Sequence, residues 1–369
     1  MQRREFLGAL AAAPLAAQTS SAQSSSAKKG MLYVGAWQKK IIVIDEAAQK
    51  VAGEVELKYD VPRSLMLSED KKKIIVHSMK DCGFEFVDIA TKKVEHSFVL
   101  NEGGKRYRPN GFAITPDDKK LYTTFYMTEK KIDRFEVGKT KWGIIDIASG
   151  KLEKELDVPK EMEGRGGRGG GLRFSPDGKF LYSFRDNVYI YDATTLKEVD
   201  KIELSKPMFP GMERVNIGPG DDPYEERGTV LGFFNSTDPI VHRSVFGFAK
   251  FDLTKRTFDF TPVGPSTGGM MGMRLTPDRK FAYTVAFNGN GANRRTEFWT
   301  FDVAAKKLLK TQEFDGRSRF DYSISSDGKT LYIFGAGFEL ESFDTVTLKQ
   351  TKVLDVNADM TSNMLVVPG

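Results

Sequence analysis

The chain has 369 residues, of which 40% are hydrophobic and 11% aromatic, so it is long enough to bury a large core. Its formal charge of +5 comes from 55 basic and 50 acidic residues that are interspersed, which excludes a basic tail of the kind that binds nucleic acid. Cys82 is the single cysteine, which excludes an intramolecular disulfide, a Cys-x-x-Cys zinc site and a Cys-x-x-Cys-His haem attachment.

The N-terminal residues have the pattern of an export signal. A charged start, Gln2 to Leu7, precedes an apolar run from Gly8 to Ala17 and a stretch of small residues. The adjacent arginines followed by Phe-Leu resemble a bacterial twin-arginine signal, with an ordinary secretory signal that carries two arginines as the alternative. We therefore expect residues 1–22 to be an export signal, residues 23–30 to be a flexible spacer, and the protein to be periplasmic or secreted. No later segment has the length and apolar character of a membrane span.

The rest of the chain is a series of similar units, and the clearest copy runs from Gly171 to Leu204. Turn residues, first Ser-Pro-Asp-Gly and later a segment that opens with Asp192, separate short runs in which apolar and polar residues alternate. The runs are Leu172 to Phe174, Phe180 to Phe184, Val188 to Tyr191 and Val199 to Leu204. Alternation with a period of two between turns predicts four antiparallel β-strands in each unit.

An aspartate follows the third expected strand of every unit. The carboxylate of an aspartate in this position can accept hydrogen bonds from backbone amides two or three residues later, which closes a tight turn. We therefore interpret these aspartates as structural turn residues. They are Asp45, Asp88, Asp146, Asp192, Asp252, Asp302 and Asp344.

A second turn, Ser/Thr-Pro-Asp or a relative of it followed by Lys, gives an independent count of the units. It begins at Ser68, Thr115, Ser175, Thr276 and Ser325, and a degenerate copy occurs at Gly218 to Asp221. The remaining unit is divided between the chain ends: the segment from Met31 supplies its second, third and fourth strands, and Ser362 to Gly369 supplies its first. We therefore predict an all-β fold, a seven-bladed β-propeller of four-stranded blades. The C-terminal strand joins the N-terminal blade, so that residues 31–369 form one domain.

The Ser-Pro-Asp-Gly-Lys and Tyr-Asp-Ala-Thr-Thr-Leu-Lys segments resemble the YVTN-type β-propeller repeat, and the likeness covers Met31 to Gly369. The layout of the C-terminal half, including Ser323 to Gly328, Phe338 to Asp344 and Met364-Leu365, is similar to the propeller β subunit of quinohemoprotein amine dehydrogenases. The heavy chain of methylamine dehydrogenase is a looser likeness. The resemblance implies a subunit without its own cofactor beside redox partners. Such propellers host enzymes, enzyme subunits and binding scaffolds alike, so these motifs indicate an architecture and not a chemistry.

The two faces of the predicted propeller differ. Turns between first and second strands and between third and fourth strands are short and repetitive, and we call their side the short-turn face. The other connections are long and variable, which is usual for binding residues on a rigid scaffold, and we call their side the long-loop face. Arginine there suits anionic ligands or acidic partner surfaces, with pairing to nearby acidic residues as the alternative. The expected ligand- or partner-binding residues at the channel mouth of this face are Arg63, Arg108, Asn110, Arg168, Arg214, Arg319 and Asn363.

Two functions fit these features. The first is a non-catalytic binding scaffold, or the propeller subunit of an extracytoplasmic complex, which binds another exported protein on the long-loop face. The second is a lactonase-like hydrolase, in which arginines bind an anionic substrate and Glu213 or Asp321 activates water at the channel mouth. His77, His96 and His242 are the only histidines, and their spacing is not that of a metal site. We expect no metal, no cofactor and no nucleic-acid partner, and we expect a small anionic ligand as a second partner.

Overall fold

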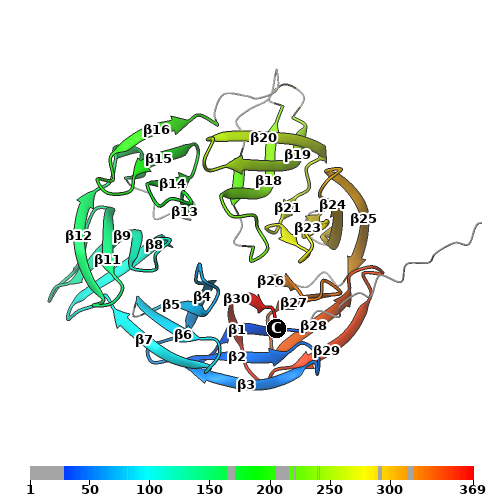
Figure 1. Ribbon diagram of the computed structural model, residues 1–369, viewed down its shortest axis with the longest axis horizontal. Helices are drawn as coiled ribbons and strands as arrows, with labels where there is room; N and C mark the ends of the chain where they lie inside the picture. Colours follow the sequence, from blue (N-terminus) through cyan, green and yellow to red (C-terminus); the bar gives the residue numbers. More distant parts are fainter. Residues whose placement is uncertain are drawn as a thin grey trace, which may run out of the picture.

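The computed structural model describes residues 29–80, 82–163, 171–204, 216–219, 222–238, 240, 242–289, 293–314 and 319–369. Its strands form seven antiparallel sheets arranged in a ring around a central axis (Figure 1). The protein is therefore a seven-bladed β-propeller, as the repeats predict. The expected export signal, residues 1–22, and most of the expected spacer lie outside the described residues.

Each blade is one sheet whose first strand lies nearest the axis (Figure 1). Blade 1 contains β30 (Met360–Val367), β1 (Met31–Ala36), β2 (Lys40–Asp45) and β3 (Lys50–Glu56); blade 2 contains β4 (Pro62–Leu67), β5 (Lys73–Ser78), β6 (Gly83–Asp88) and β7 (Lys93–Val99). Blade 3 contains β8 (Lys105–Ile114), β9 (Lys120–Lys130), β11 (Lys141–Asp146) and β12 (Lys151–Asp157), with β10 (Phe135–Val137) beside β9. The short 3-10 helix η1 (Lys160–Met162) follows β12.

The remaining blades follow in chain order. Blade 4 contains β13 (Leu172–Phe174), β14 (Phe180–Phe184), β15 (Val188–Asp192) and β16 (Glu198–Ile202); blade 5 contains β17 (Asn216–Pro219), β18 (Thr229–Thr237), β19 (Ser244–Asp252) and β20 (Thr257–Pro265). Blade 6 contains β21 (Gly269–Met270), β22 (Arg274–Leu275), β23 (Phe281–Asn288), β24 (Arg295–Asp302) and β25 (Lys307–Phe314); blade 7 contains β26 (Arg319–Ile324), β27 (Thr330–Gly335), β28 (Glu339–Asp344) and β29 (Gln350–Asp355). Within the described ranges, no helix has the length and apolar character needed to cross a membrane.

The C-terminal strand closes the ring. β30 pairs antiparallel with β1, so that Met31 lies opposite Val367 and Val34 lies opposite Met364. The prediction that head and tail share one sheet is therefore confirmed. Structural contacts begin before β1, within the segment that the sequence assigns to the spacer: the backbone N–H of Gly30 donates to the Glu46 carboxylate at 3.0 Å.

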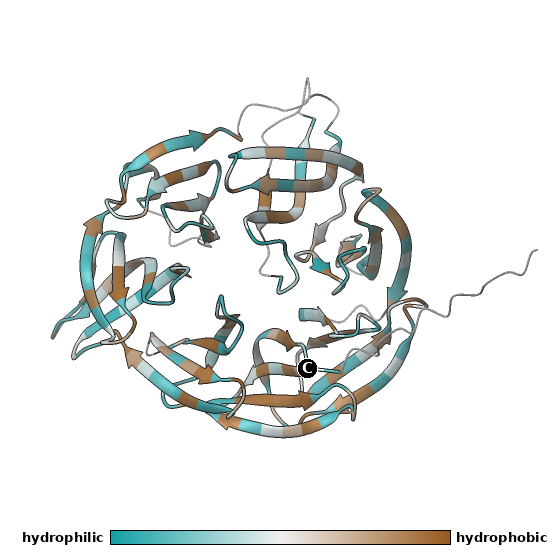
Figure 2. Cartoon of the chain, viewed as in Figure 1, coloured by the Kyte–Doolittle hydropathy of each residue, from teal (hydrophilic) through white to brown (hydrophobic). Residues whose placement is uncertain are grey.

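The core lies between the blades, because neighbouring sheets pack face to face. The middle strands are buried on both sides, and in β2 the consecutive residues Ile41, Ile42 and Val43 are all fully buried. The outermost strands have one face in solvent, so exposed positions alternate along β3 with half-buried or buried ones. Figure 2 shows this alternation of hydrophilic and hydrophobic residues along the outer strands.

The turn after each third strand is closed by its aspartate. Asp192 Oδ1 accepts hydrogen bonds from the backbone N–H groups of Thr194 and Thr195, at 3.1 and 2.8 Å. The corresponding aspartates of the other six blades accept the same kind of bond from backbone N–H groups two or three residues later. Because these bonds are local, the turn forms from its own sequence and recurs in every blade.

The turn after the first strand is closed by a hydroxyl group. Ser175 Oγ donates to Asp177 Oδ1 at 2.6 Å and accepts from the backbone N–H of Phe180 at 3.0 Å. The same two bonds occur in the turns that begin at Ser68, Thr115, Thr276 and Ser325. Within the described residues blade 5 lacks this hydroxyl turn, and residues 222–228 precede its second strand.

A tyrosine in the second strand links each of three blades to the next. Its hydroxyl donates to the carbonyl oxygen of the residue that follows the turn aspartate. The pairs are Tyr122 with Ala193, Tyr182 with Leu253 and Tyr283 with Thr345, at 2.9, 2.5 and 3.2 Å. Blade 2 has Ile75 at the tyrosine position, and there His96 Nε2 in β7 donates to the carbonyl oxygen of Ile147 at 2.5 Å. Blades 2 and 3 are thus linked through the equivalent carbonyl group, that of the residue after the turn aspartate, but the donor comes from the fourth strand instead of the second.

The junction between blades 7 and 1 contains a buried carboxylate at a position where blades 2 to 6 have an apolar residue. Glu46 follows the turn aspartate of blade 1, and its side chain is 1% exposed. Its carboxylate accepts hydrogen bonds from Ser326 Oγ and from the backbone N–H of Ser326, at 2.5 and 3.2 Å. The corresponding turn position is proline in blades 3, 4 and 6. Burial raises the pKa of Glu46, while the bonds from Ser326 and Gly30 oppose this shift.

We predict that Glu46→Leu and Ser326→Pro each destabilise the protein, whereas the double variant loses less than the sum of the two, because only the N–H of Gly30 then stays without an acceptor. Each single substitution leaves a buried polar group without its partner, which costs about 1–3 kcal/mol. The double variant carries the residue types found at other junctions. Denaturant unfolding of the four proteins gives the coupling free energy, which we expect to be about 1 kcal/mol or more. Simple addition of the two losses would contradict this account of the junction.

Candidate functional site

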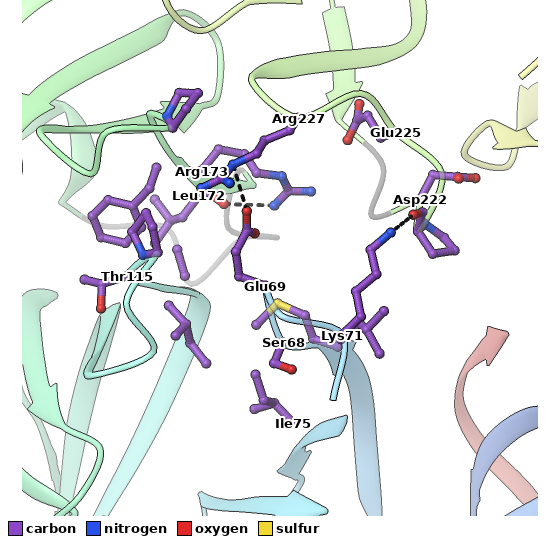
Figure 3. A pocket seen from close by; sticks show the side chains of 18 of the residues that line it. Ser68, Glu69, Lys71, Ile75, Thr115, Leu172, Arg173, Asp222, Glu225 and Arg227 are labelled. Atoms are coloured by element: carbon purple, nitrogen blue, oxygen red, sulfur yellow. Dashed lines mark hydrogen bonds and ion pairs between the residues drawn. The ribbon is translucent and has the colours of Figure 1, made fainter. Parts of the chain in front are cut away.

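A cavity of 410 Å³ lies in the central channel and opens on the short-turn face (Figure 3). Its wall is formed by residues near the ends of β4, β8, β13 and β30. Residues 222–228, which we call the β17–β18 connection, line one side of it. The sequence places the expected site at the mouth on the opposite, long-loop face, so the position of this cavity differs from that expectation.

The wall of the cavity has both an apolar and a polar part, and its apolar part comes mainly from the first strands. Apolar residues stand near the end of each first strand because they pack against the neighbouring blade, and Leu65 and Leu172 are buried there. The apolar residues that line the cavity include Leu65, Phe112, Ile114, Leu172, Phe174 and Leu365. An apolar group that enters this space is removed from contact with water. This removal is the main favourable contribution to binding in pockets of this kind.

Charged side chains from three blades meet at the opening of the cavity (Figure 3). Glu69 Oε1 of blade 2 lies 3.1 Å from Arg227 Nε of blade 5. Lys71 Nζ of blade 2 donates to the carbonyl oxygen of Pro223 in blade 5 at 3.2 Å. Arg173 of β13 lines the same cavity, and its guanidinium donates to the carbonyl oxygen of Leu172 at 2.8 Å. Blades 2 and 5 are not neighbours in the ring, so the first two contacts cross the opening.

The β17–β18 connection is fixed by its own carboxylates. The two carboxylate oxygens of Asp222 accept from the backbone N–H groups of Leu275 and Tyr224, both at 2.8 Å. The carboxylate of Glu225 accepts from the backbone N–H of Leu231. Burial raises the pKa of Asp222, and these hydrogen bonds oppose the shift. The carboxylates of Asp222 and Glu225 are thus both occupied by hydrogen bonds from backbone N–H groups.

Arg319 does not lie open at the channel mouth. Its side chain is buried in blade 7, where its two terminal nitrogens contact the carboxylate oxygens of Glu341 at 2.5 and 3.1 Å. Its guanidinium also lies 5.5 Å from the ring centre of Phe314. A buried bidentate pair holds β26 to β28 within the sheet, and breaking such a pair is costly. Arg319 is therefore placed as a structural residue, which differs from its expected role in ligand binding.

Asp321 and Asn363 join neighbouring blades. Asp321 Oδ2 accepts from the backbone N–H of Met364 at 2.6 Å, which links blade 7 to blade 1. Asn363 accepts from the backbone N–H of Leu65 at 2.8 Å and donates to the Leu65 carbonyl oxygen at 2.9 Å, which links blade 1 to blade 2. Burial raises the pKa of Asp321, although Arg274, with its Nη2 atom 3.5 Å from Asp321 Oδ1, opposes the shift. Asp321 is thus held in an inter-blade contact, which differs from its expected role as a free base.

The other predicted binding residues are spread over the molecule. Arg63 at the start of β4 and Arg108 in β8 are exposed, and Asn110 in β8 is half-buried. These three lie toward the long-loop face and do not line the cavity, whereas Asn363 does. The remaining predicted residues lie outside the described residues; they are Arg168, Glu213 and Arg214. Within the described part of the chain, the predicted set does not gather at one site.

The charged residues that do meet at the cavity are absent from the predicted set. Lys71 and Arg173 come from a turn and a strand end that look like ordinary copies of the repeat, whereas Glu69 and Arg227 lie where the sequence departs from it. Two departures from the repeat were available as signals. Glu69 stands where proline is usual, and the β17–β18 connection replaces the short hydroxyl turn.

The side chains of His77 and Cys82 are buried. His77 belongs to β5, and its ring stacks on Phe84 with 5.0 Å between ring centres. Burial, with a smaller effect of Arg63, lowers the pKa of His77 to about 4, and burial raises the pKa of Cys82 to about 12. Neither side chain is suited to act as a base or nucleophile at neutral pH. The described residues contain no group of three or more His, Cys, Asp or Glu placed to hold a metal ion.

We predict that Asp321→Ala lowers the free energy of unfolding by about 1–3 kcal/mol, because it leaves the N–H of Met364 without an acceptor. Asp321→Asn should cost less, because the amide oxygen can still accept that bond. Denaturant unfolding measures both losses. Unchanged stability of Asp321→Ala would show that the bond to Met364 does not hold blades 7 and 1 together.

We predict that the protein loses stability as the pH falls from 6.5 towards 4. In this range the unfolded chain binds a proton at His77 and the folded chain does not, so the folded state is disfavoured. The lowered pKa corresponds to a loss of about 3 kcal/mol. Urea unfolding between pH 4 and pH 7.5 should show a smaller loss for His77→Phe than for the wild type. His242→Phe, at an exposed histidine, is the control, and equal pH profiles for all three proteins would contradict the prediction.

Comparison with known proteins identifies the fold and no family. No family model matches the chain, and no curated protein matches its sequence. The Pseudomonas aeruginosa periplasmic gluconolactonase PpgL has a TM-score of 0.55 at 14% identity, over 92% of this chain and 99% of that one. Kuenenia stuttgartiensis hydrazine synthase has a TM-score of 0.51 at 14% identity, over 84% and 95%. Dihydro-heme d1 dehydrogenase NirN in complex with DHE has a TM-score of 0.53 at 15% identity, over 92% and 75%. Likeness at such identity is likeness of fold, so the resemblance to YVTN repeats and to amine dehydrogenase β subunits stays a prediction.

Proposed function

We propose that this protein is an exported, non-catalytic β-propeller that binds another exported protein through its long-loop face. The observation that carries the proposal is a set of exposed apolar side chains at the ends of the blades on this face. They are Trp37, Met79, Ile132, Phe135, Val137, Ile240, Phe320 and Phe338. Exposed apolar groups gathered on one face are typical of protein interaction sites.

The apolar side chains of blades 7 and 1 are the best-defined part of this surface. The segment between β29 and β30 runs between them, because Val356 N–H donates to the Phe338 carbonyl oxygen and Trp37 N–H donates to the Asp359 carbonyl oxygen. Trp37 and Phe338 are each at least half exposed, at 55% and 50%. Aromatic side chains that a partner buries supply much of the binding energy in such interfaces.

Exposed arginines on the same face indicate the chemistry of the partner. They are Arg63, Arg106, Arg108, Arg294 and Arg295. Arginines on the same face as exposed apolar side chains suit a partner that has carboxylates beside its own apolar patch, because guanidinium groups donate paired hydrogen bonds to carboxylates. The proposed partner is therefore an exported protein with acidic residues beside an apolar patch. One structural neighbour is a periplasmic gluconolactonase, which supports the proposal that this protein is exported.

The hydrolase alternative has less support. It depends on Glu213, which lies outside the described residues, and on Asp321, whose carboxylate is engaged by Met364 and Arg274. A general base needs a carboxylate that can reach substrate water. The likeness to a gluconolactonase is one of fold at 14% identity and adds no catalytic residue. The proposal of a binding role therefore stands ahead of hydrolysis.

We predict that the double variant Trp37→Glu with Phe338→Glu loses the partner. Two buried aromatic anchors each contribute about 2 kcal/mol or more, so the dissociation constant should rise about a hundredfold or more. The measurement is affinity purification of the tagged, exported protein with cross-linking, followed by direct titration of the purified partner.

Val346→Glu is the matched control, because Val346 is 78% exposed and lies in a turn of the short-turn face. The same partner should be recovered with the wild type and with this control. Equal recovery by all three proteins would refute the assignment of this face. Turnover of glucono-1,5-lactone by the purified chain, above the rate in buffer, would refute the non-catalytic role.

A further inference from the structure

Two departures from the repeat meet at the cavity on the short-turn face. The second residue of the turn after the first strand is Pro116, Pro176 and Pro277 in blades 3, 4 and 6, and Ser326 in blade 7 serves the junction with Glu46. In blade 2 this residue is Glu69, and in blade 5 the turn is replaced by the β17–β18 connection. The two departures face each other, because Glu69 contacts Arg227 of the connection across the opening (Figure 3).

The contact between Glu69 and Arg227 is not needed to hold the connection in place. The side chains are 49% and 65% exposed, and an exposed ion pair adds little to stability. Asp222 and Glu225 already fix the connection to backbone groups of blades 6 and 5. The pair therefore lies at the mouth of the cavity and adds little to the free energy of unfolding. Another acidic group can replace Glu69 on Arg227 with little loss of stability.

We propose that the cavity binds a small organic anion with an apolar body, whose acidic group takes the place of Glu69 on Arg227. Arg227 presents a guanidinium fork that binds carboxylate, sulfonate or phosphate oxygens. Lys71 adds a second positive charge at the same opening. The apolar wall that includes Leu65, Leu172 and Leu365 receives the body of the ligand.

The size and the remaining charges of the cavity agree with this ligand class. Its volume of 410 Å³ lies within the range of about 300–1,000 Å³ that is usual for small-molecule sites. The carboxylate of Glu226 lies 3.2 Å from Lys250 Nζ, so Glu226 is paired with a lysine of its own blade. Asp222 and Glu225, which also line the cavity, accept hydrogen bonds from backbone N–H groups. Asp118 is a further carboxyl group in the wall, and burial, with nearby Asp70 and Glu69, raises its pKa.

The proposal is tested with two probes of the same apolar body and different charge. 8-Anilinonaphthalene-1-sulfonate carries a sulfonate, and N-phenyl-1-naphthylamine lacks it. Their affinities are measured by fluorescence titration with the full chain as wild type, Glu69→Gln and Arg227→Gln. Arg256→Gln is the matched control, because Arg256 also lies 3.1 Å from a carboxylate oxygen, of Asp200, and is away from the cavity. Melting temperatures establish that each variant is folded.

We expect Glu69→Gln to bind the sulfonate probe several-fold more tightly and Arg227→Gln to bind it about tenfold more weakly, since a charge-assisted hydrogen bond is removed. The neutral probe should respond little to either change, and Arg256→Gln should match the wild type. A shift of both cavity variants in the same direction would mean that the ion pair is only a structural clasp. Equal sulfonate binding by wild type and Arg227→Gln would overturn the proposal, because the anion would then bind elsewhere.

Discussion

The pairing of β30 with β1 is the contact on which the rest of the structure depends. It brings the two ends of the folded region into one sheet, at an entropic cost that local contacts must offset. The eight-residue strand does this by burying Met364 and Val366 and by donating a hydrogen bond from the Met364 backbone N–H to the Asp321 carboxylate. Through Asn363 it also reaches blade 2. One strand thus holds three blades, and without it the channel and its cavity would lack part of their wall.

The fold could be predicted from the sequence because its turns are closed by neighbours in the chain. Asp192 and Ser175 each bind groups within five residues, so every blade carries the same local signal regardless of its surroundings. Closure was also visible, since the first strand missing near Met31 is present near the C-terminus. What repeats in the sequence is what each blade needs for itself.

The candidate site could not be predicted in the same way because its contacts are long-range. Arg319 looks like a channel arginine until β28 brings Glu341 beside it. Asp321 looks like a free carboxylate until β30 supplies the N–H of Met364. The pair of Glu69 and Arg227 joins blades that are not neighbours in the ring. In a repeat fold, the informative residues are those that break the pattern, and their partners are known only when the ring is closed.

The two proposed binding surfaces lie at opposite ends of the same strands. β4 begins with Arg63 near the long-loop face and ends with Leu67 in the wall of the cavity on the short-turn face. A partner docked on Trp37 and Phe338 would therefore leave the mouth between Glu69 and Arg227 open. The inner strands are joined by inter-blade hydrogen bonds such as those between Asn363 and Leu65, and we expect binding at one face to be independent of binding at the other. Two separate sites on one ring are thus compatible, each using the side on which its residues depart from the repeat.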